Sequence, residues 1–399
     1  MTNQRFDVVI SGGGIAGLAA TAAFANAGFK VQCIDPTPPV TIRDGEGSDL
    51  RTTAFLQPAR EFLDEIGLWP RFAPHAAPLQ IMRIVDAGGE QIEPRIVKDF
   101  NAQDISTAPF GWNLPNWLLR REMLDVLKNN SNVDLRLGVA TTTLFTRENE
   151  ARVGLTDGSV SRCKLVIAAD GRDSPMRNAA QISVKTTTYG QKALALAVNH
   201  PIPHENVSTE IHRSGGPFTL VPLPDHNGMP SSALVWMERG ARAQELFAMQ
   251  EVDFNNEMTE RSCGLLGPLT QASRRTIWPI INQTADHLYG ERIALIAEAA
   301  HVVPPIGAQG LNMSLGDMRI LLDLATNDPE NIGNINMLET YQRKRHTEIL
   351  IRAKGIDLLN RASMVETPAL RDARAMGLNA LYALPAVRKT LMQMGLGVH

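Results

Sequence analysis

The feature that most constrains the fold of this chain lies near its start, where residues 6–35 read FDVVISGGGIAGLAATAAFANAGFKVQCID. The short apolar run at 6–10 predicts a parallel strand that is buried on both faces. The alanine-rich residues 15–27 predict a helix that Gly28 ends, and residues 30–34 predict a second strand. A strand, a helix and a second strand in this order form a βαβ unit, which indicates an α/β fold.

The turn between the first strand and the helix carries the pattern GxGxxG. Gly12 permits the tight turn, Gly14 lets a pyrophosphate approach the backbone, and Gly17 lets the helix pack closely on the strand. Asp35 ends the second strand, where a carboxylate accepts hydrogen bonds from both ribose hydroxyls; a turn kept for packing alone would not explain this acid. The pattern therefore predicts a site for FAD or NAD, rather than NADP, at Gly12, Gly14, Ile15, Ala16, Gly17 and Asp35.

Charge and composition exclude several classes of protein. The net charge of −3 gives no footprint for nucleic acid, so we expect no nucleic-acid partner. The sequence has no apolar run long enough to span a membrane, and its first residues enter a strand too early for a signal peptide. Its three cysteines lie far apart, which predicts neither a disulfide framework nor a metal site. We therefore expect a cytoplasmic protein.

The rest of the chain changes character twice. Apolar spacing predicts helices at 57–68, 119–129, 310–325 and 337–360, followed by a helical tail. Residues 133–169 predict strands, and residues 180–280 contain β-type runs separated by Pro, Gly and Asn. The buried-strand pattern of the first unit returns near residue 293. We therefore expect a Rossmann-like domain assembled from both ends of the chain, with a mixed, sheet-rich domain between them.

A second landmark is the sequence DGRDSPMR at 170–177. The buried strand before it delivers Asp170 to the carboxyl edge of the sheet, where the ligands of open α/β sheets bind. Ser174 is placed to cap a short helix that Pro175 begins. A cap and turn without any ligand is an equal alternative for this segment.

The third landmark is the sequence IAEAAHVVPPIGAQGLN at 296–312. A strand is expected to bring Glu298 to the same sheet edge, where it would hold polyol hydroxyls. After two stiffening prolines, Gly307 and Gly310 start a helix whose free N–H groups suit negative charge, such as the N1/C2 carbonyl edge of a reduced flavin. An extended FAD would use both helix starts, whereas a nicotinamide would need only one. For His301 we favour a role in fixing the loop over one in proton transfer.

Together these motifs resemble those of the single-component FAD-dependent aromatic hydroxylases, the superfamily of 4-hydroxybenzoate hydroxylase. The resemblance spans essentially the whole chain and is weakest at 180–280. Segments 49–69, 110–124 and 374–397 are similar, within that superfamily, to the ubiquinone-biosynthesis hydroxylases. The chain departs from the family in one place, because it has Ala297-Glu298 where the family usually has Gly-Asp.

The resemblance implies further cofactor contacts. Arg51 matches an arginine near the FAD pyrophosphate and the approach of the nicotinamide, and Arg120 matches a polar residue that contacts the cofactor. Asp170 and Gly171 match a motif implicated in contacts with FAD and NAD(P)H. The flavin loop is matched by Pro305, Gly307, Gly310, Leu311 and Asn312, of which Pro305 and Gly307 are nearest the chemistry. No catalytic side chain is assigned.

The resemblance also implies a reaction. FAD would be the resident cofactor, NAD(P)H would bind transiently to reduce it, and O2 would be the co-substrate that forms a flavin C4a-hydroperoxide. The product would be a hydroxylated ring of a polyprenylated phenol or quinol intermediate in ubiquinone biosynthesis. Because such a substrate is lipid-soluble, we expect peripheral contact with the inner face of the membrane or a multi-enzyme quinone-biosynthesis assembly.

On this basis an FAD-binding domain is expected to comprise residues 1–75, 111–180 and 282–340. A substrate domain would comprise 76–110 and 181–281, and a helical C-terminal region 341–399. In that region one helical stripe is predicted to contain Leu378, Leu381, Leu384, Val387, Leu391 and Met394. Contact of the stripe with a membrane or a partner is one interpretation, and packing on the protein itself is favoured.

Three other functions stay open at this point. The same fold could hydroxylate a small soluble aromatic acid, which a basic residue aimed into the pocket from the second domain would favour; an open apolar tunnel would favour a prenylated ring. A different flavin reaction, such as prenyl-chain reduction or halogenation, is the second alternative. The third is a non-catalytic scaffold subunit. Its only support in the sequence is Glu298, which stands where the family usually has aspartate.

Overall fold

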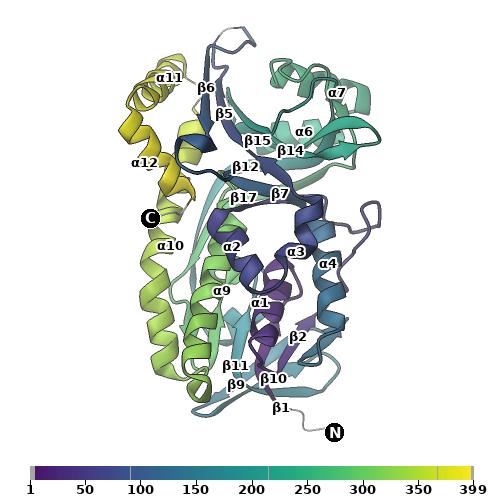
Figure 1. Ribbon diagram of the computed structural model, residues 1–399, viewed down its shortest axis with the longest axis vertical. Helices are drawn as coiled ribbons and strands as arrows, with labels where there is room; N and C mark the ends of the chain where they lie inside the picture. Colours follow the sequence, from purple (N-terminus) through teal and green to yellow (C-terminus); the bar gives the residue numbers. More distant parts are fainter. Residues whose placement is uncertain (1–4, 90, 214, 366, 397–399) are drawn as a thin grey trace.

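The computed structural model describes residues 5–89, 91–213, 215–365 and 367–396. Figure 1 shows two bodies stacked along the long axis, each built on a β-sheet, with a small third sheet between them. The N-terminus lies at the lower end, and the last helices lie along one side and beside the upper body. This arrangement confirms the α/β fold with a second, sheet-rich body and a helical C-terminal region.

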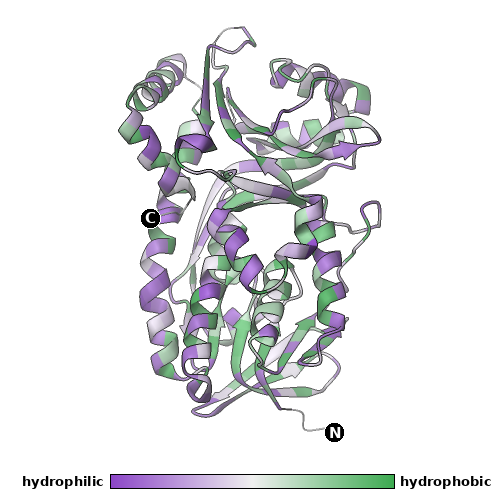
Figure 2. Ribbon diagram, in the orientation of Figure 1, coloured by the Kyte–Doolittle hydropathy of each residue, from purple (hydrophilic) through white to green (hydrophobic). Residues whose placement is uncertain are grey.

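The lower body is built on a sheet of β1 Arg5–Ser11, β2 Val31–Asp35, β8 Val133–Leu137, β9 Thr141–Arg147, β10 Glu150–Leu155, β11 Val160–Ala168, β18 Tyr289–Gly290 and β19 Ile293–Leu295. The order is β18-β19-β11-β1-β2-β8, and the strands from β19 to β8 run parallel. Parallel strands are covered on both faces, which explains the continuous apolar strands seen in Figure 2. Because β1, β11 and β19 are neighbours, the segments that follow them meet at one carboxyl edge.

Helices cover this sheet: α1 Ile15–Asn26, α4 Asn116–Lys128, α5 Pro175–Ala179, α8 Ala297–Ala300 and α9 Gln309–Asn327, which a 3-10 turn at Pro329–Asn331 follows. Figure 1 places α1, α4 and α9 together in front of the sheet. α1 is buried along nearly its whole length, because its alanine side chains allow close packing against the strands, α4 and α9. As predicted, Gly28 follows the helix, with a φ of +94° that favours glycine.

The upper body is built on a mixed sheet of β5 Ile81–Asp86, β6 Ile96–Asn101, β12 Val184–Asn199, β13 Val207–His212, β14 Pro217–His226, β15 Met229–Arg239, β16 Thr270–Gln271, β17 Thr276–Ala285 and β20 His301–Val302. The order is β20-β17-β12-β15-β14-β13-β5-β6, with β16 beside β12. On one face Leu194, Leu220 and Leu234 pack under α6 Gly240–Ala248 and α7 Glu251–Arg261. On the other face Ala193 and Met237 join the core of the lower body.

A small sheet joins the two bodies, in the order β3 Thr52–Leu56, β7 Gly111–Pro115 and β4 Ala77–Leu79. Beside it lie α2 Gln57–Glu65, α3 Trp69–Phe72 and 3-10 turns at Ala73–His75 and Ala102–Asp104. α2 corresponds to the helix predicted at 57–68 and ends three residues before the predicted end, at Glu65. The Asn113 side chain in β7 donates a hydrogen bond of 2.9 Å to the carbonyl oxygen of Pro222 in β14, which ties the small sheet to the upper body. The proposed domain boundaries stay predictions.

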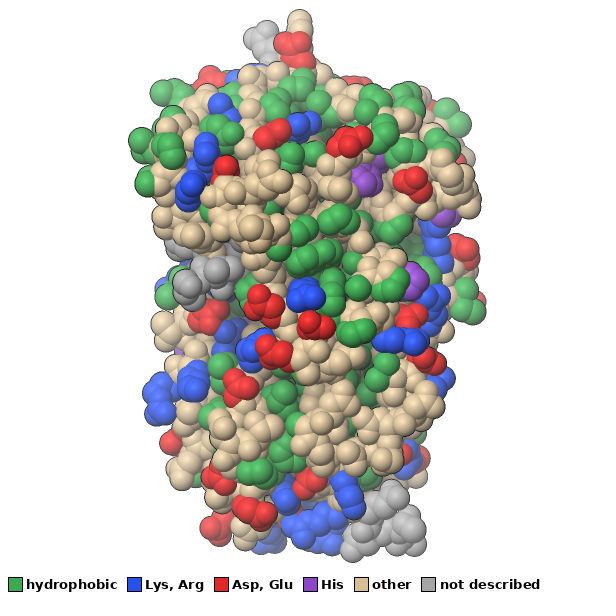
Figure 3. Space-filling view, viewed as in Figure 1, with side chains coloured by type: hydrophobic (Ala, Val, Ile, Leu, Met, Phe, Trp, Pro, Cys, Tyr) green, Lys and Arg blue, Asp and Glu red, His purple; other side chains and the backbone are tan. Residues whose placement is uncertain are grey.

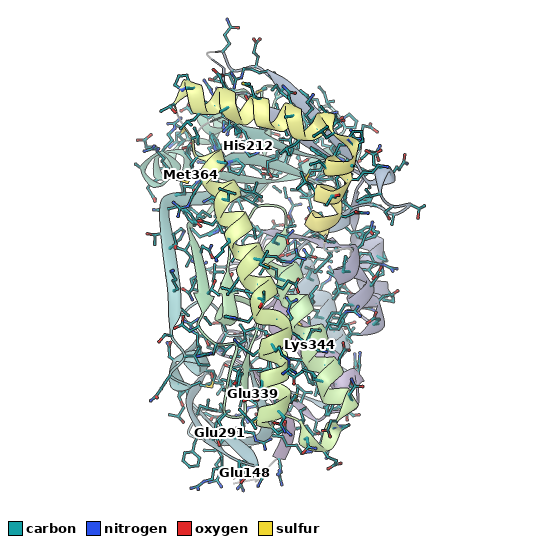
Figure 4. All side chains as sticks on the ribbon, turned by 90° about the vertical axis from the view of Figure 1, so that its left-hand side faces the viewer. Glu148, His212, Glu291, Glu339, Lys344 and Met364 are labelled. Carbon is teal, nitrogen blue, oxygen red and sulfur yellow. The ribbon has the colours of Figure 1, made fainter. Side chains whose placement is uncertain are left out.

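The C-terminal region consists of α10 Ile335–Ser363, α11 Pro368–Ala383 and α12 Pro385–Leu396. Figure 4 shows α10 running up the side of the molecule from Glu339 past Lys344 to Met364, where α11 crosses over the upper body near His212. Within the part of the chain that the structure describes, no helix has both the length and the apolar character needed to cross a membrane.

The apolar stripe predicted at 378–394 is wrong as a single helix. Pro385 cannot donate a backbone hydrogen bond, so α11 ends before it and α12 begins with it. Leu378 is half-buried on the inner side of α11, whereas Leu381 is exposed. Packing on the protein itself therefore holds for the inner sides of α11 and α12, whereas Leu381, Leu384, Val387 and Leu391 of the stripe are exposed. The side chain of Met394 lies outside the described residues.

Candidate cofactor site

The glycine loop has the close contacts that its sequence predicts. Gly12 has a φ of +107°, and a Cβ atom there would lie 2.3 Å from the carbonyl oxygen of Ala169. A Cβ atom on Gly17 would lie 1.8 Å from the carbonyl oxygen of Gly12, so both positions require glycine. Gly14 differs, because no heavy atom lies within 4 Å of the place where its Cβ would be. The loop therefore leaves open space beside Gly14 alone among these three.

The start of α1 is left free for an anion. Its N-cap residue, Gly14, makes no side-chain capping hydrogen bond, and its first turn, which Ile15 and Ala16 begin, contains no acidic residue. The first N–H groups of a helix have no partner within the helix, and the helix dipole adds positive potential there. A phosphate group is the ligand that such a helix start favours.

Asp35 lies directly behind this loop. Its Oδ2 atom accepts a hydrogen bond of 2.5 Å from the Gly13 N–H, and its Oδ1 atom accepts one of 2.8 Å from the Thr37 N–H. A carboxylate oxygen has more than one lone pair, so both oxygens can still accept hydrogen bonds from ribose hydroxyls. Asp35 therefore both orders the glycine loop and presents acceptors at the end of β2.

The carboxyl edge of the sheet brings the second landmark to the first. Asp170 accepts hydrogen bonds of 3.1 Å from the Ser11 hydroxyl and from the Met176 N–H, and a short one from Ser174. Burial of this side chain raises the pKa of Asp170. Ser174 also caps α5, as predicted, so the segment does act as a cap and turn. Gly171 follows with a φ of +86° and turns the chain toward α5.

Glu298 does not lie on a strand, which corrects the sequence-based expectation. β19 ends at Leu295, and Glu298 lies in the single turn of α8. Its carboxylate lies 3.8 Å from the Arg172 guanidinium, and its side chain is about half exposed. It therefore reaches the same edge as Asp170 from a helix turn, and the extra methylene of glutamate is accommodated there.

Two arginines predicted to contact the cofactor meet at an acid that the sequence analysis missed. Asp49 accepts hydrogen bonds from Arg51 at 2.8 Å, from Arg120 at 3.4 Å and from the Asn116 side chain at 3.0 Å. Burial would raise the pKa of Asp49, but Arg51, Asn116 and Arg120 outweigh it and lower the pKa to about 2. The Arg51 guanidinium also lies 5.7 Å from the centre of the Trp278 ring.

Arg120 carries an orphaned donor. Its Nε atom is buried and has no hydrogen-bond partner among the residues that the structure describes. A buried donor of a charged group is costly to leave unpaired, so a further acceptor is expected beside it. An anionic cofactor lying along the loop would supply that acceptor.

The loop before α9 forms the second helix start. Gly307 and the N-cap residue Ala308 both have left-handed backbones, with φ of +63° and +57°, and no side chain caps the helix. α9 begins at Gln309, so only Gly310 of the two predicted glycines lies inside it, and its Cβ direction is open. Pro305 and Leu311 flank this turn. The free N–H groups again favour negative charge.

Asn312 fixes this helix start to the small sheet. Its side-chain amide donates to the carbonyl oxygens of Ala54 at 2.8 Å and Ala308 at 2.6 Å, and its oxygen accepts from the Leu56 N–H at 2.9 Å. The amide thus satisfies backbone groups of β3 and of the loop at once. The position of the loop is therefore set by contacts between segments that are about 250 residues apart in sequence.

A buried ion network supports the loop from behind. His301 Nε2 lies 2.7 Å from Asp317 Oδ2, and the Arg345 guanidinium donates to Asp317 Oδ1 at 2.8 Å. Arg345 belongs to α10, and from this helix Arg352 also donates a hydrogen bond of 3.0 Å to the side chain of Gln309, the first residue of α9. His301 therefore has the loop-fixing hydrogen bond that we favoured for it.

The two helix starts lie at the same end of the lower body. α1 and α9 are in contact, and Figure 1 shows them side by side, below the upper sheet. The open space at Gly14, the uncapped starts of both helices and the orphaned Arg120 donor fit a long anionic ligand whose pyrophosphate lies at the start of α1. FAD has these properties, so the residues present fit this cofactor.

Comparison with known proteins decides the family. The sequence profile described as "FAD binding domain" matches residues 5–349. The chain belongs to this FAD-binding family. The superfamily resemblance drawn from the three motifs is thereby confirmed.

Relatives of this FAD-binding protein match it over nearly its full length. The ubiquinone hydroxylase UbiL of Rhodospirillum rubrum is 30% identical, over 98% of this chain and 89% of that protein. The 3-demethoxyubiquinol 3-hydroxylase of Escherichia coli (strain K12) is 26% identical over 100% of both chains. The crystal structure of the p-nitrophenol 4-monooxygenase PnpA from Pseudomonas putida DLL-E4 has the same fold, with a TM-score of 0.80, 19% identity and 99% of both chains covered.

An Asp35→Ala variant is expected to bind FAD roughly 10- to 150-fold more weakly, because hydrogen bonds to a charged group contribute about 1.5–3 kcal/mol. Titration of FAD into the apoprotein, followed by flavin fluorescence, measures the change. Asp7→Ala is a matched control, since Asp7 also accepts a backbone hydrogen bond, of 3.0 Å from Lys30, but at the opposite end of the strands. Equal affinities of the two variants would remove Asp35 from the site.

Proposed function

We propose that this FAD-binding protein is an FAD-dependent monooxygenase that hydroxylates an aromatic ring of a polyprenylated phenol or quinol intermediate in ubiquinone biosynthesis. Relatives over the full length of the chain are named as hydroxylases of ubiquinone or demethoxyubiquinol. The single observation on this chain that supports the proposal is the apolar character of the sheet face opposite the flavin loop.

That face is formed by alternate residues of β12, β14 and β15. Beyond Ala193 and Met237, which are packed in the core of the lower body, the cross-strand pairs place the following side chains on it: Ala195, Ala197, Thr219, Val221, Ala233 and Val235. The residues between them point the other way, into the core under α6 and α7. In these central positions the side chains are small or apolar, and none is charged. None of these positions supplies the basic partner that a soluble aromatic acid would need, so the face itself favours a prenylated ring. Basic residues line the neighbouring pocket together with Ala197, and they are Arg43, His75 and His226.

We propose that NAD(P)H and O2 are the co-substrates. A pocket of about 250 Å³ lies beside Arg51, because the neighbouring residues Leu50 and Thr52 line it. Its lining also includes Arg43, whose guanidinium suits an anionic dinucleotide that binds transiently, together with His75, Asp225 and His226. Ala197, which lies on the apolar face of the upper sheet, also lines this pocket, so the reductant would approach from that face.

The protein's own part in the reaction is to hold, orient and shield. When bound, FAD would supply the redox chemistry: it would be reduced by NAD(P)H, activate O2 and transfer the hydroxyl group. The N–H groups at the start of α9 are placed to hold negative charge, and Asn312 keeps that helix start in position. The apolar face of the upper sheet excludes water from the ring. No side chain that removes a proton from the substrate is assigned.

Two measurements test this function. Purified protein loaded with FAD is expected to consume NAD(P)H in an O2-dependent manner and to place labelled oxygen from 18O2 in a prenylated phenol. Expression in cells that lack a quinone hydroxylase is expected to remove the prenylated intermediates that accumulate, as detected by mass spectrometry. Unchanged accumulation together with oxidation of a soluble phenol would favour the aromatic-acid alternative, and a colourless protein that takes up no FAD would favour the scaffold.

A further inference from the structure

The C-terminal helices are held to the protein by one side and expose apolar residues on the other. On the inner side of α11, Arg374 donates hydrogen bonds of 3.0 and 2.8 Å to the buried carboxylate of Asp86, and the Tyr382 hydroxyl donates to the Asp99 carbonyl oxygen at 2.9 Å. On α12, Arg388 lies 3.3 Å from Asp104. These contacts fix which side of the two helices faces solvent.

The outer side of α11 lacks charge. Helical spacing places Ala369, Ala373, Met376, Ala380 and Ala383 on it, and all five are exposed. The side chain of Met376 is 72% exposed, so it makes little contact with the rest of the protein. A surface helix of a globular protein usually turns polar residues toward water. This helix does the reverse on its outer side.

Neighbouring segments extend this exposed apolar surface. We define the C-terminal apolar face by its large exposed side chains: Leu358 and Leu359 near the end of α10, Leu370, Met376 and Leu381 on α11, Leu384 at the break, and Val387 and Leu391 on α12. Figure 3 shows hydrophobic side chains gathered at the upper left edge, over α11, with Lys and Arg side chains beside them. Clustering of this kind marks an interaction site, whereas single exposed apolar residues are ordinary.

The charge of this region differs from that of the rest of the chain. Residues 350–399 contain seven Lys and Arg and three Asp and Glu, a net charge of +4. Because the whole chain has a net charge of −3, the first 349 residues carry −7. An apolar surface with a basic surround is complementary to a bilayer that contains anionic lipids. A soluble partner protein would not need the two properties together.

α12 connects this face to the flavin loop. Met392 is buried on its inner side, in a cluster with Leu56 and Phe110. The Leu56 N–H donates to Asn312 in α9, and the Gln309 side chain donates at 3.1 Å to the carbonyl oxygen of Gly395. A helix that touches the loop on one side and presents leucines to solvent on the other would bring a lipid-soluble molecule close to the site.

We propose that the C-terminal apolar face docks on a bilayer containing anionic lipids, with α11 and α12 lying in the interfacial plane. The apolar residues enter the acyl boundary. Arg374 and Arg388 stay paired inward with Asp86 and Asp104, and the exposed Lys389 approaches the lipid headgroups. The docking itself follows from this surface; its use for delivery of a prenylated substrate rests on the proposed function.

Sedimentation of the FAD-loaded protein with vesicles tests the docking. Binding is expected to vesicles of phosphatidylcholine mixed with phosphatidylglycerol, to be weaker with phosphatidylcholine alone, and to weaken as salt is added. A Met376→Glu/Leu381→Glu variant should bind at least about tenfold more weakly, because two apolar side chains would no longer be buried in the bilayer. Lys389→Glu should weaken binding to the anionic vesicles only.

A matched control is Val160→Glu/Val252→Glu, which changes two exposed valines, 57% and 71% exposed, far from the C-terminal helices in sequence. This variant should bind vesicles like the unmodified protein.

Absence of binding to both kinds of vesicle would overturn the docking. So would a dimer in solution that the Met376→Glu/Leu381→Glu variant dissociates, because a second copy would then cover the face. Vesicle binding without ring hydroxylation would refute the proposed function and leave the docking intact.

Discussion

A Gly14→Val variant is expected to fold normally and to lose FAD. Gly14 has φ −68° and ψ 177°, an extended conformation that valine also adopts, and no protein atom within 4 Å would obstruct the new Cβ. The side chain would occupy the space in which the pyrophosphate approaches the start of α1. We expect the dissociation constant for FAD to rise by at least ~100-fold, which corresponds to about 2.7 kcal/mol.

Two measurements on the same sample separate binding from folding. Circular dichroism and thermal unfolding of the apoprotein should match the unmodified protein, while fluorescence titration with FAD shows the loss. Gly355→Val in α10 is a suitable control, because its Cβ position is also open. Gly17→Val should fail to fold, since its side chain would overlap the Gly12 carbonyl oxygen. Ordinary FAD affinity in the Gly14 variant would show that the cofactor lies elsewhere.

Removal of the Asp317 carboxylate is expected to lower the free energy of unfolding by about 3–5 kcal/mol, the usual cost of breaking a buried ion pair. Asp317 is fully buried between His301 and Arg345, and the Arg345 side chain is only 6% exposed. Asp317→Ala would leave the buried Nε of this guanidinium without its acceptor. Urea denaturation measures the change.

The surroundings of Arg345 supply the controls. Glu348 also pairs with Arg345 but is 40% exposed, so Glu348→Ala should cost much less. An Asp317→Leu/Arg345→Met variant should recover much of the lost stability, because an apolar pair replaces both charges. If Asp317→Ala and Glu348→Ala destabilise the protein equally, the buried pair contributes no more than a surface pair.

The same pair predicts a pH dependence. Burial would raise the pKa of Asp317, but Arg345 and His301 outweigh it and hold the pKa below its ordinary value of 3.8. A depressed pKa in the folded state gives stability that is present above the ordinary pKa and lost as the pH falls through the folded value. The stability difference between the unmodified protein and Asp317→Ala should therefore be largest near neutral pH and shrink in acid.

Local signals in the sequence were sufficient for the cofactor loops. The glycines at 12, 14 and 17, the acid at 35 and the strand–turn–helix around them act through backbone geometry, which a short segment determines. The same holds for the Ser174 cap and for the turn at Gly307. Both helix starts were therefore predictable, and the structure adds only that α9 begins two residues later than its first glycine.

The parts that could not be predicted depend on contacts between distant segments. Asp49 looks like an ordinary loop acid until α4 brings Arg120 and Asn116 to it. The Asp317 network likewise forms only when α9 and α10 pack together. Glu298 was misplaced because an apolar run continues past the end of β19, and apolar periodicity cannot show where hydrogen bonding stops. The break at Pro385 is visible in the sequence, because proline cannot continue α11.

The amide of Asn312 cannot be exchanged for a carboxylate without loss of its contacts. Its nitrogen faces two carbonyl oxygens, and its oxygen faces an N–H group, so aspartate at this position would set a negative charge against two acceptors. Conversion of this one amide to a carboxylate changes the mass of the chain by one part in tens of thousands, yet it would loosen the flavin loop from β3.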